Sequence, residues 1–563
     1  MRDRVGVLFL CVLGLGAGVA RGQSTLPLKH APQPTTPAIT AADLMTRLYI
    51  YADDSMQGRE AGTPGNVKAT NYIAAELKRL GLQPAGDSGT YFQTIPLKNR
   101  SFDTTSTFTV AGAPLVAFQD YLALSRQPAS TPAVATVFGG TLGDTTRTIT
   151  PAQAAGKLVV LMTGGFNSLR QARRLPAIEG SWGTALIGLD SFPPQFLGFI
   201  RRPQTFLDDN PPTQPQPTVF LISRAAAARI FAGSLDSLPI GTAGATAAVD
   251  VRYNVTPISD PARNVVAIVP GSDPKLKGEY VAIGAHNDHI GLARPVDHDS
   301  IRIWNHTVRP EGADDGGRQA TPAQQVMVDS VLTGYRAKHA GASRIDSISN
   351  GADDDGSGTV SALEVAERVV TLKVKPKRSL LFVWHVGEEK GLLGSRFFTD
   401  HPTVPRDSIV AQLNMDMVGR GDASDETGRT KDGTPIHGGP TYLQLVGSRR
   451  LSTELGNLIE SVNTEGKHGL TLDYSIDADG HPSNIYCRSD HYEYARYGIP
   501  ITFFTTGLHS DYHQVTDEPQ YIDYEHMARI ANFVEDIALH VANLDHRVVV
   551  DHPKPDPTAP CRQ

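Results

Sequence analysis

Cysteine is scarce in this sequence of 563 residues, which contains only Cys11, Cys487 and Cys561. No pair of them has the spacing of a thiolate metal site or of a redox motif, which argues against those chemistries. Cys487 and Cys561 belong to the body of the chain. In an exported protein they could form a disulfide, and two free thiols are an equally open alternative.

The sequence also lacks a strong charge excess and, beyond its first residues, a long apolar run. Lys and Arg number 52 against 59 Asp and Glu, a net charge of −7. This balance argues against a nucleic acid or an anionic membrane as partner. No later stretch is long enough to span a bilayer, so no integral membrane segment is expected in the mature chain. No internal repeat is present beyond a short echo, GADD, which occurs twice.

The N-terminus has the pattern of a secretory signal over residues 1–22. A basic start, MRDR, precedes the apolar run VGVLFLCVLGLGAGVA and small residues suited to cleavage. We therefore expect a secreted or periplasmic protein. Residues 23–40 are rich in Pro and Thr and predict a flexible lead-in, and residues 551–563 form a similar tail.

The length predicts two domains. Residues 127–255 contain short apolar runs among turn residues, which predicts a β-rich inserted module. The flanking segments 41–126 and 256–550 would then form one discontinuous domain. Within it, residues 66–82 have a helical period, with Ala69, Ile73, Leu77 and Leu80 on one face and Gly81 just past the end.

Four apolar runs in the second half of the chain each end in polar residues. They are EYVAIGAH, SLLFVWHVGEE, IVAQLNMDM and GIPITFFTTG. Continuous apolar runs are typical of buried parallel strands, and open α/β sheets bind ligands at the carboxyl ends of their strands. The pattern predicts an α/β fold with a mostly parallel mixed sheet between helices, and a site at one edge of that sheet.

The residues at these strand ends are imidazoles and carboxylates. In chain order they are His286, Asp288, the two GADD copies, Glu388, Glu389, Asp416 and His513. Such a nitrogen and oxygen set suits zinc, manganese or cobalt. It also exceeds the roughly three protein ligands of one catalytic zinc, so two metals sharing a carboxylate are predicted. A paired site of this kind activates water, and an adjacent glutamate can then accept the proton.

Five motifs in this order resemble one family of enzymes. AHNDHIG, GADDDGSG, WHVGEEKGLLGS, LNMDMVG and YHQVTDEP are similar to motifs of the zinc-dependent exopeptidases of the aminopeptidase Y and bacterial leucyl aminopeptidase family. Glutamate carboxypeptidase and the transferrin receptor are distant relatives. The resemblance covers roughly residues 41–545, and the insert at 127–255 resembles the protease-associated (PA) domain of that family. It implies a zinc exopeptidase sandwich that removes N-terminal residues from peptides with two zinc ions, for which manganese or cobalt could substitute.

The resemblance also implies a role for each residue. His286 and Asp416 would bind one zinc, Glu389 and His513 the other, and Asp354 would bridge them. Glu388 would be the general base, and Asp288 would orient His286 through the second nitrogen of the imidazole. Supporting roles are implied for Asp517, which would brace the His513 loop, for Met417 in the substrate pocket, and more weakly for Ser489, Asp490 and His491.

Context separates the two GADD copies. The copy at Asp354 precedes a helical pattern and then a buried strand, whereas the copy at Asp314 and Asp315 leads into a polar stretch. We therefore expect Asp354 to be the bridging ligand, and Asp314 and Asp315 to form a turn. The surrounding residues 290–350 depart from compact family members and are expected to form a lid or a specificity loop.

Other histidines are expected to stand apart from the set. His509 would be loop structure, and the remainder structural or surface residues: His289, His298, His306, His385, His437 and His481.

Three alternatives remain open. A carboxypeptidase or dipeptidase could use the same metals with a cationic pocket formed by Arg420, Arg488 or Arg496. A glutaminyl cyclase would need one zinc, and a non-catalytic binding protein should have lost ligands that are all present here. The sequence leaves the oligomeric state unknown.

Overall fold

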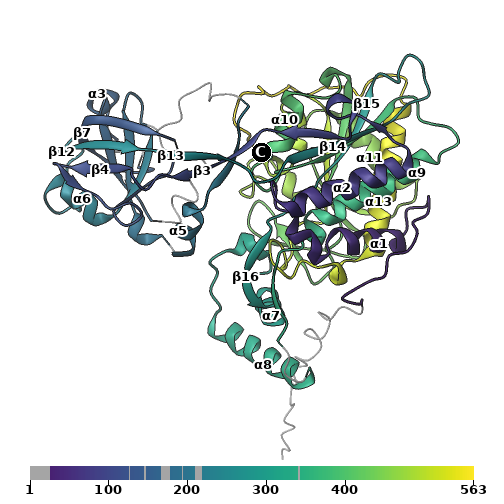
Figure 1. Ribbon diagram of the computed structural model, residues 1–563, viewed down its shortest axis with the longest axis horizontal. Helices are drawn as coiled ribbons and strands as arrows, with labels where there is room; N and C mark the ends of the chain where they lie inside the picture. Colours follow the sequence, from purple (N-terminus) through teal and green to yellow (C-terminus); the bar gives the residue numbers. More distant parts are fainter. Residues whose placement is uncertain are drawn as a thin grey trace, which may run out of the picture. The chain divides into compact units, whose positions relative to one another are not determined.

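The computed structural model describes residues 26–125, 127–144, 148–165, 178–192, 194–209, 218–339 and 343–563 (Figure 1). The signal sequence predicted for residues 1–22 lies outside them. The chain forms two compact units, one from Met1–Ile95 with Asp260–Gln563 and the other from Pro96–Ser259. Within the described ranges, no helix combines the length and apolar character needed to cross a membrane.

The larger unit is built on a nine-stranded mixed sheet. Its four central strands are parallel neighbours. They are β18 (Ser379–His385), β15 (Tyr280–His286), β19 (Ile409–Met415) and β24 (Ile501–Thr505). On one side of these strands, β14 (Ala262–Val269) pairs antiparallel with β18, and β1 (Gln83–Pro84) and β2 (Phe92–Ile95) pair antiparallel with β14. On the other side, β22 (Tyr442–Val446) pairs antiparallel with β24, and β23 (Thr471–Asp473) pairs parallel with β22. The α/β class is confirmed, although half of the pairings are antiparallel.

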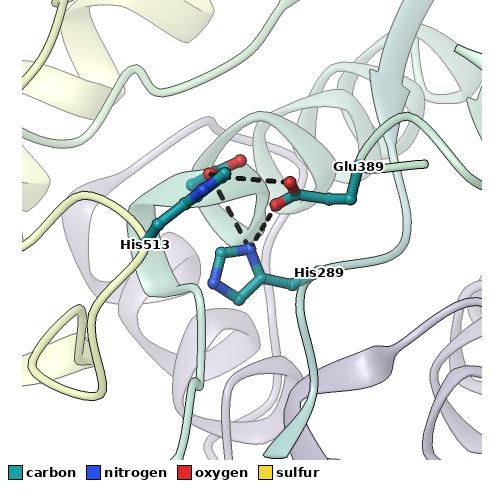
Figure 2. Close-up of side chains that lie close together, drawn as sticks. His289, Glu389 and His513 are labelled. Atoms are coloured by element: carbon teal, nitrogen blue, oxygen red, sulfur yellow. Dashed lines mark ion pairs between the residues drawn. The ribbon is translucent and has the colours of Figure 1, made fainter. Parts of the chain in front are cut away.

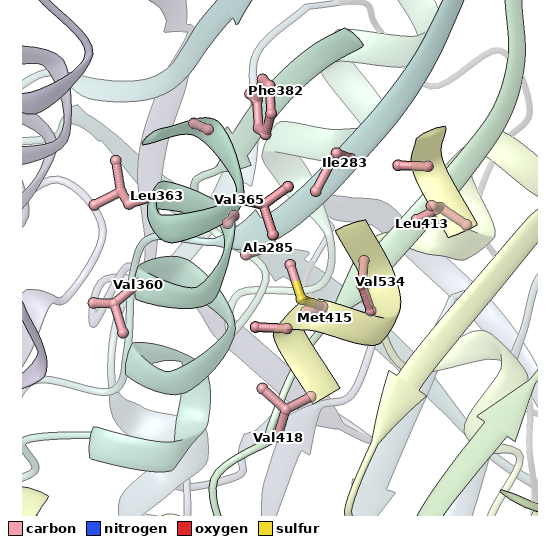
Figure 3. Packing of buried hydrophobic residues seen from close by; sticks show 14 of the residues in the cluster. Ile283, Ala285, Val360, Leu363, Val365, Phe382, Leu413, Met415, Val418 and Val534 are labelled. Carbon is pink, nitrogen blue, oxygen red and sulfur yellow. The ribbon is translucent and has the colours of Figure 1, made fainter. Parts of the chain in front are cut away.

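Both faces of this sheet are buried, which explains the continuous apolar runs. Along β15, Ile283 belongs to the apolar cluster of one face and its neighbour Ala282 to that of the other. Figure 3 shows the first face, where Val365 and Val534 pack among the side chains of the central strands. That face is covered by α1 (Ala41–Tyr51), α2 (Pro64–Leu80), α9 (Gly358–Val370), α11 (Thr453–Glu465) and α13 (Tyr524–Asn543), and the other by α10 (Leu393–Asp400) and α12 (His491–Ala495).

The predicted helix over residues 66–82 is confirmed as α2. Ala69, Ile73 and Leu77 are fully buried against the sheet, and Leu80 packs at the edge of the same cluster. Gly81 ends the helix in the left-handed region at φ 77°, where a residue without a Cβ is not strained.

The smaller unit contains an eight-stranded sheet with apolar clusters on both sides. Its strands are β4 (Thr107–Val110), β5 (Ala113–Pro114), β6 (Tyr121–Ala123), β7 (Ala129–Thr141), β8 (Leu158–Met162), β9 (Gly183–Ile187), β11 (Val219–Ile222) and β12 (Ala243–Val251). Helices α3 (Pro151–Ala154), α5 (Pro194–Arg201) and α6 (Arg224–Phe231) accompany them, and β3 (Leu97–Phe102), β10 (Gln204–Leu207) and β13 (Tyr253–Pro257) form a separate three-stranded sheet.

The boundary of this unit differs from the prediction. The predicted insert begins at residue 127, but the structure places the boundary at Pro96. The reason is strand pairing: β4 pairs with β12 and β6 pairs with β11, so residues before 127 complete the sheet. These pairings join segments more than 90 residues apart, which local sequence patterns do not reveal.

The described residues of 290–339 and 343–350 form a small subdomain of the larger unit. It consists of the antiparallel pair β16 (Leu292–Asp297) and β17 (Ile345–Ile348), the helices α7 (His298–Val308) and α8 (Pro322–Lys338), and the single turn η5 (Gly312–Asp315) that contains the first GADD.

Candidate metal centre

The carboxyl ends of the four central strands bring the predicted residues together. His286 is the last residue of β15, and Asp416 directly follows β19. Glu389 lies shortly after β18, and His513 lies in the loop that follows β24. Because the four strands are parallel neighbours, these ends share one edge of the sheet.

Two groups of ligating atoms meet at Asp354. Its Oδ1 lies 3.1 Å from Nε2 of His286, which is also 3.5 Å from Oδ1 of Asp416. Its Oδ2 lies 3.0 Å from Nε2 of His513, which is also 3.0 Å from Oε2 of Glu389. One carboxylate thus presents an oxygen to each of two groups, which is the arrangement that a bridging ligand requires.

The three aspartates of the second GADD have separate contacts. They lie in the turn η6 (Ala352–Ser357), which leads directly into α9. Asp353 accepts a hydrogen bond from the amide of Gly419 at 2.7 Å. Asp355 accepts from the amides of His286 and Gly358, each at 2.9 Å. The outer two aspartates therefore tie the turn to neighbouring elements, and only Asp354 faces both groups.

Asp517 and His509 hold this turn from the other side. The carboxylate of Asp517 accepts hydrogen bonds from the amides of Asp353 and Asp354 at 3.0–3.1 Å. His509 is fully buried, and its Nε2 lies 3.2 Å from Oδ2 of Asp353. The loop that carries His513 is thereby fastened to the turn that carries Asp354, and His509 is a structural residue of that loop.

The polar atoms of the centre fit a metal. Nε2 of His286 and Oε1 of Glu389 are buried and form no hydrogen bond of good geometry, and their near neighbours are other ligating atoms of the two groups. Nδ1 of His286 donates a hydrogen bond of 3.0 Å to the carbonyl oxygen of Asp288, so Nε2 is the nitrogen whose lone pair can bind a cation. Buried atoms of this kind are normally satisfied, and a cation held by imidazole and carboxylate ligands would satisfy them.

Asp288 does contact the second imidazole nitrogen of His286, but through its backbone carbonyl. Its carboxylate is 3.9 Å from Nδ1 of His286, so the backbone carbonyl of Asp288 orients the imidazole. The carboxylate instead accepts hydrogen bonds from the amides of Gly387 at 2.7 Å and Glu388 at 3.2 Å. It therefore positions the turn that carries Glu388.

His289 was not expected to belong to the set, and that expectation is wrong. It is fully buried, and its Nδ1 lies 2.8 Å from Oε1 of Glu389 and 3.7 Å from Oδ2 of Asp354 (Figure 2). With Asp354, Glu389 and His513 it forms a group whose ligating atoms lie within 4.8 Å of one another. The one sequence signal was its position three residues after His286, at the end of the same strand.

The two adjacent glutamates have opposite electrostatic surroundings. Burial acts to raise the pKa of Glu389, yet the facing imidazoles of His513 and His289 bring that pKa down to about 2. Burial raises the pKa of Glu388 well above its ordinary value, and the charges of Glu389 and Asp416 add to this against the opposing effect of His286. Glu389 is thus suited to hold a cation and Glu388 to hold a proton.

A pocket opens beside the two groups. Glu388, Asp354 and Asp416 line its polar end. The expectation that Met417 lines it is met, and further apolar side chains complete the wall: Ile476, Ile485, Phe503 and Leu508.

The segment 489–491 contributes one residue to the centre. Ser489 lines the pocket and donates a hydrogen bond of 2.7 Å to Oδ2 of Asp416. Asp490 instead lies 3.5 Å from His385, and the buried His491 bonds the carbonyl of Tyr486. Of the three weaker candidates, Ser489 alone touches the centre.

The three arginines considered for a substrate carboxylate differ in position. Arg420 is buried and lies 3.0 Å from Asp511, and Arg496 lies 2.5 Å from Glu493. Arg488 does line the pocket. Its neighbour Cys487 forms a disulfide with Cys561, which decides between the two alternatives left open for these cysteines.

The part of the chain that carries most of this site matches a known family of peptidases. Residues 328–538 match the model of peptidase family M28. This confirms the resemblance to the zinc-dependent exopeptidases. The matched range contains Asp354, Glu388, Glu389, Asp416 and His513, whereas His286 precedes it.

Among curated proteins, the chain is similar to fungal leucine aminopeptidases. It is 30% identical over 193 residues to leucine aminopeptidase 1 of Sclerotinia sclerotiorum, covering 32% of this chain and 44% of that protein. It is 26% identical over 300 residues to leucine aminopeptidase 1 of Trichophyton equinum, covering 51% and 58%. The chain thus spans about half the length of these relatives. Among solved structures, an aminopeptidase from Aneurinibacillus sp. strain AM-1 is 17% identical with a TM-score of 0.47, over 92% of this chain and 97% of that one.

Proposed function

We propose that this protein is an exported zinc-dependent aminopeptidase that holds two metal ions and removes N-terminal residues from peptides. The observation that carries the proposal is the placement of Asp354, whose two oxygens face two separate groups of ligating atoms beside a pocket lined by Glu388. His286 and Asp416 would hold one ion, and Glu389 and His513 the other. His289, at 2.8 Å from Glu389, would fix the orientation of that carboxylate.

The ions would supply the Lewis-acid chemistry that lowers the pKa of water and stabilises an oxyanion. The chain itself provides the proton transfer and the positioning. Glu388 takes a proton from the attacking water and delivers it to the amine that leaves. The backbone around Glu388 is held by the carboxylate of Asp288, so the base faces the pocket in a fixed direction. The apolar pocket wall receives the substrate side chain next to the cleaved bond.

The export signal over residues 1–22 and the assignment of the smaller unit as a PA domain belong to the same proposal. The signal pattern and the β-rich sheet of the smaller unit support them. A carboxypeptidase or dipeptidase is the second candidate, because two guanidinium groups, of Arg429 and Arg488, line the pocket and are of the type that receives a substrate carboxylate, although both are paired with carboxylates of this chain.

The test combines metal analysis with a substrate panel. The purified protein should contain about two zinc ions per chain and, without chelator, cleave aminoacyl anilides but neither N-blocked peptides nor substrates that require a C-terminal carboxylate. Glu388→Gln should lower kcat at least about 100-fold while the metal content stays unchanged. The surface variant Glu525→Gln is the control. Wild-type turnover in Glu388→Gln would refute the mechanism, and cleavage of N-blocked dipeptides alone would favour the second candidate.

A further inference from the structure

The first GADD copy packs onto the loop that carries His513. The amide of Ala313 donates a hydrogen bond of 3.1 Å to the carbonyl of Tyr512. Gly312 has a φ of 57°, and a Cβ at this position would lie 2.6 Å from that same carbonyl and 2.8 Å from the carbonyl of His509. A side chain could not be accommodated there, so the turn η5 is fitted closely to this loop.

This contact places Asp314 against an arginine of the pocket. Its two carboxylate oxygens accept hydrogen bonds from the two terminal nitrogens of Arg488, at 2.6 and 3.3 Å. Arg488 also donates to the hydroxyl of Tyr512 at 3.1 Å. Both Arg488 and Tyr512 line the pocket. The bidentate pair occupies the guanidinium face that would otherwise bind an incoming carboxylate.

A second carboxylate of the same turn reaches the other arginine of the pocket. Oε1 of Glu311 lies 2.9 Å from Nε of Arg429, which also pairs with Glu426. Glu311 is only 13% exposed, so solvent screens this pair weakly. Arg488 and Arg429 therefore each form an ion pair with a carboxylate from the subdomain at 290–350. This subdomain is far from both arginines in the sequence.

We propose that Asp314 and Glu311 determine the side-chain specificity of the pocket by neutralising Arg488 and Arg429. With both guanidinium groups paired, the pocket takes neutral apolar side chains and rejects acidic ones. This inference rests on the proposed function, in that the pocket beside the metal centre holds the side chain of the substrate's first residue. It gives the subdomain at 290–350 a function in substrate selection.

The test measures the binding of L-leucine and L-glutamate to the metal-loaded protein by isothermal titration calorimetry. Burial raises the pKa of Glu311 to about 7, so the measurements are made at pH 8, where this carboxyl group is ionised. The wild type should prefer leucine. Asp314→Asn should reduce the leucine-to-glutamate preference at least about tenfold, because a freed guanidinium gains a charged partner. Glu311→Gln combined with Glu426→Gln removes both carboxylates that pair with Arg429, should act in the same direction, and serves as a second variant if Asp314→Asn fails to fold.

Two controls make the result specific. Asp329→Asn removes the same charge from the exposed surface of α8 in the same subdomain, at a side chain that contacts Gln325, and should keep the wild-type preference. The double variant Asp314→Asn with Arg488→Gln removes the freed cation and should restore the rejection of glutamate.

The outcomes separate the inference from the proposed function. An unchanged leucine-to-glutamate preference in both Asp314→Asn and the double variant Glu311→Gln with Glu426→Gln overturns the inference, as does the absence of amino-acid binding by any variant. Kinetics with leucyl and glutamyl anilides complete the experiment. If the binding preference shifts but no anilide is cleaved by any form, the inference stands and the proposed aminopeptidase function fails. If anilides are cleaved with an unaltered preference, the function stands and the inference fails.

Discussion

Replacing Arg47 with alanine should destabilise the larger unit far more than the same change at Arg79. Both arginines contact Glu76 on α2 and Glu367 on α9, but Arg47 is 1% exposed and Arg79 is 47% exposed. Arg47 also lies 2.5 Å from Glu364, itself 1% exposed. The cluster ties α1, α2 and α9 together, and α9 directly follows the turn that carries Asp354.

The magnitude follows from burial. Removing one partner of a buried ion pair leaves an uncompensated charge, which typically costs about 3–5 kcal/mol of unfolding free energy. At the half-exposed Arg79, solvent compensates for the lost partner, and the cost should stay below about 1 kcal/mol. The difference of at least about 2 kcal/mol between two arginines that share partners isolates the effect of burial.

The loss at Arg47 should also depend on pH. Burial raises the pKa of Glu364 from 4.5 to about 7 even though Arg47 opposes the rise. Because the folded state then binds a proton that the unfolded state releases, stability falls as pH increases from 4.5 to 7. Without Arg47 the pKa of Glu364 rises further, and the fall in stability extends to higher pH. Arg47→Ala should therefore lose less stability at pH 5 than at pH 8.

The assay is urea denaturation at both pH values, compared between variants that unfold with the same m value. Circular dichroism of the folded proteins verifies that each variant retains its secondary structure. Equal losses for Arg47→Ala and Arg79→Ala would refute the role of burial. Equal losses for Arg47→Ala at pH 5 and pH 8 would refute the raised pKa assigned to Glu364.

Three further predictions concern the centre and the disulfide. Asp354→Ala should lose bound metal and activity, while Asp315→Ala should keep about two zinc ions per chain by elemental analysis; equal metal content in the two would contradict the bridging role. His289→Ala should weaken zinc binding about 10- to 100-fold in competition with a chelator, because Glu389 loses its orienting contact. The same change at the exposed His437 should leave the zinc affinity unaltered. An unaltered zinc affinity in His289→Ala would show that His289 does not support the metal centre. Cys561→Ser opens a loop of 74 residues and should lower the unfolding free energy by up to roughly 4 kcal/mol, with reductant having no further effect on the variant.

Much of the fold could be predicted because its signals are local. The four central strands were visible as apolar runs, since a strand buried on both faces needs apolar residues throughout. The helix α2 was visible from its period and from Gly81. The limits of the smaller unit could not be predicted, because β4 and β6 belong to it through pairing with strands that are distant in the sequence.

The candidate site was accessible for a related reason. Metal-type residues stood at strand ends, and parallel strands bring such ends to one edge of a sheet. His289 was missed because a histidine near a strand end is usually a satisfied structural residue, and only the position of Glu389 distinguishes it. For Asp288, sequence could not show whether its carbonyl or its carboxylate faces His286.

The sequence by itself determined the α/β class, the order of the polar strand ends and the preference for Asp354 over the first GADD copy, because each depends on residues near one another in the chain. The tertiary structure alone decided what the first copy does. Asp314 and Arg488 are 174 residues apart and meet because η5 packs onto the His513 loop. The charged groups that pair with pocket residues are those that lie close in space. When such a contact joins two loops, no periodicity or motif in the sequence predicts it.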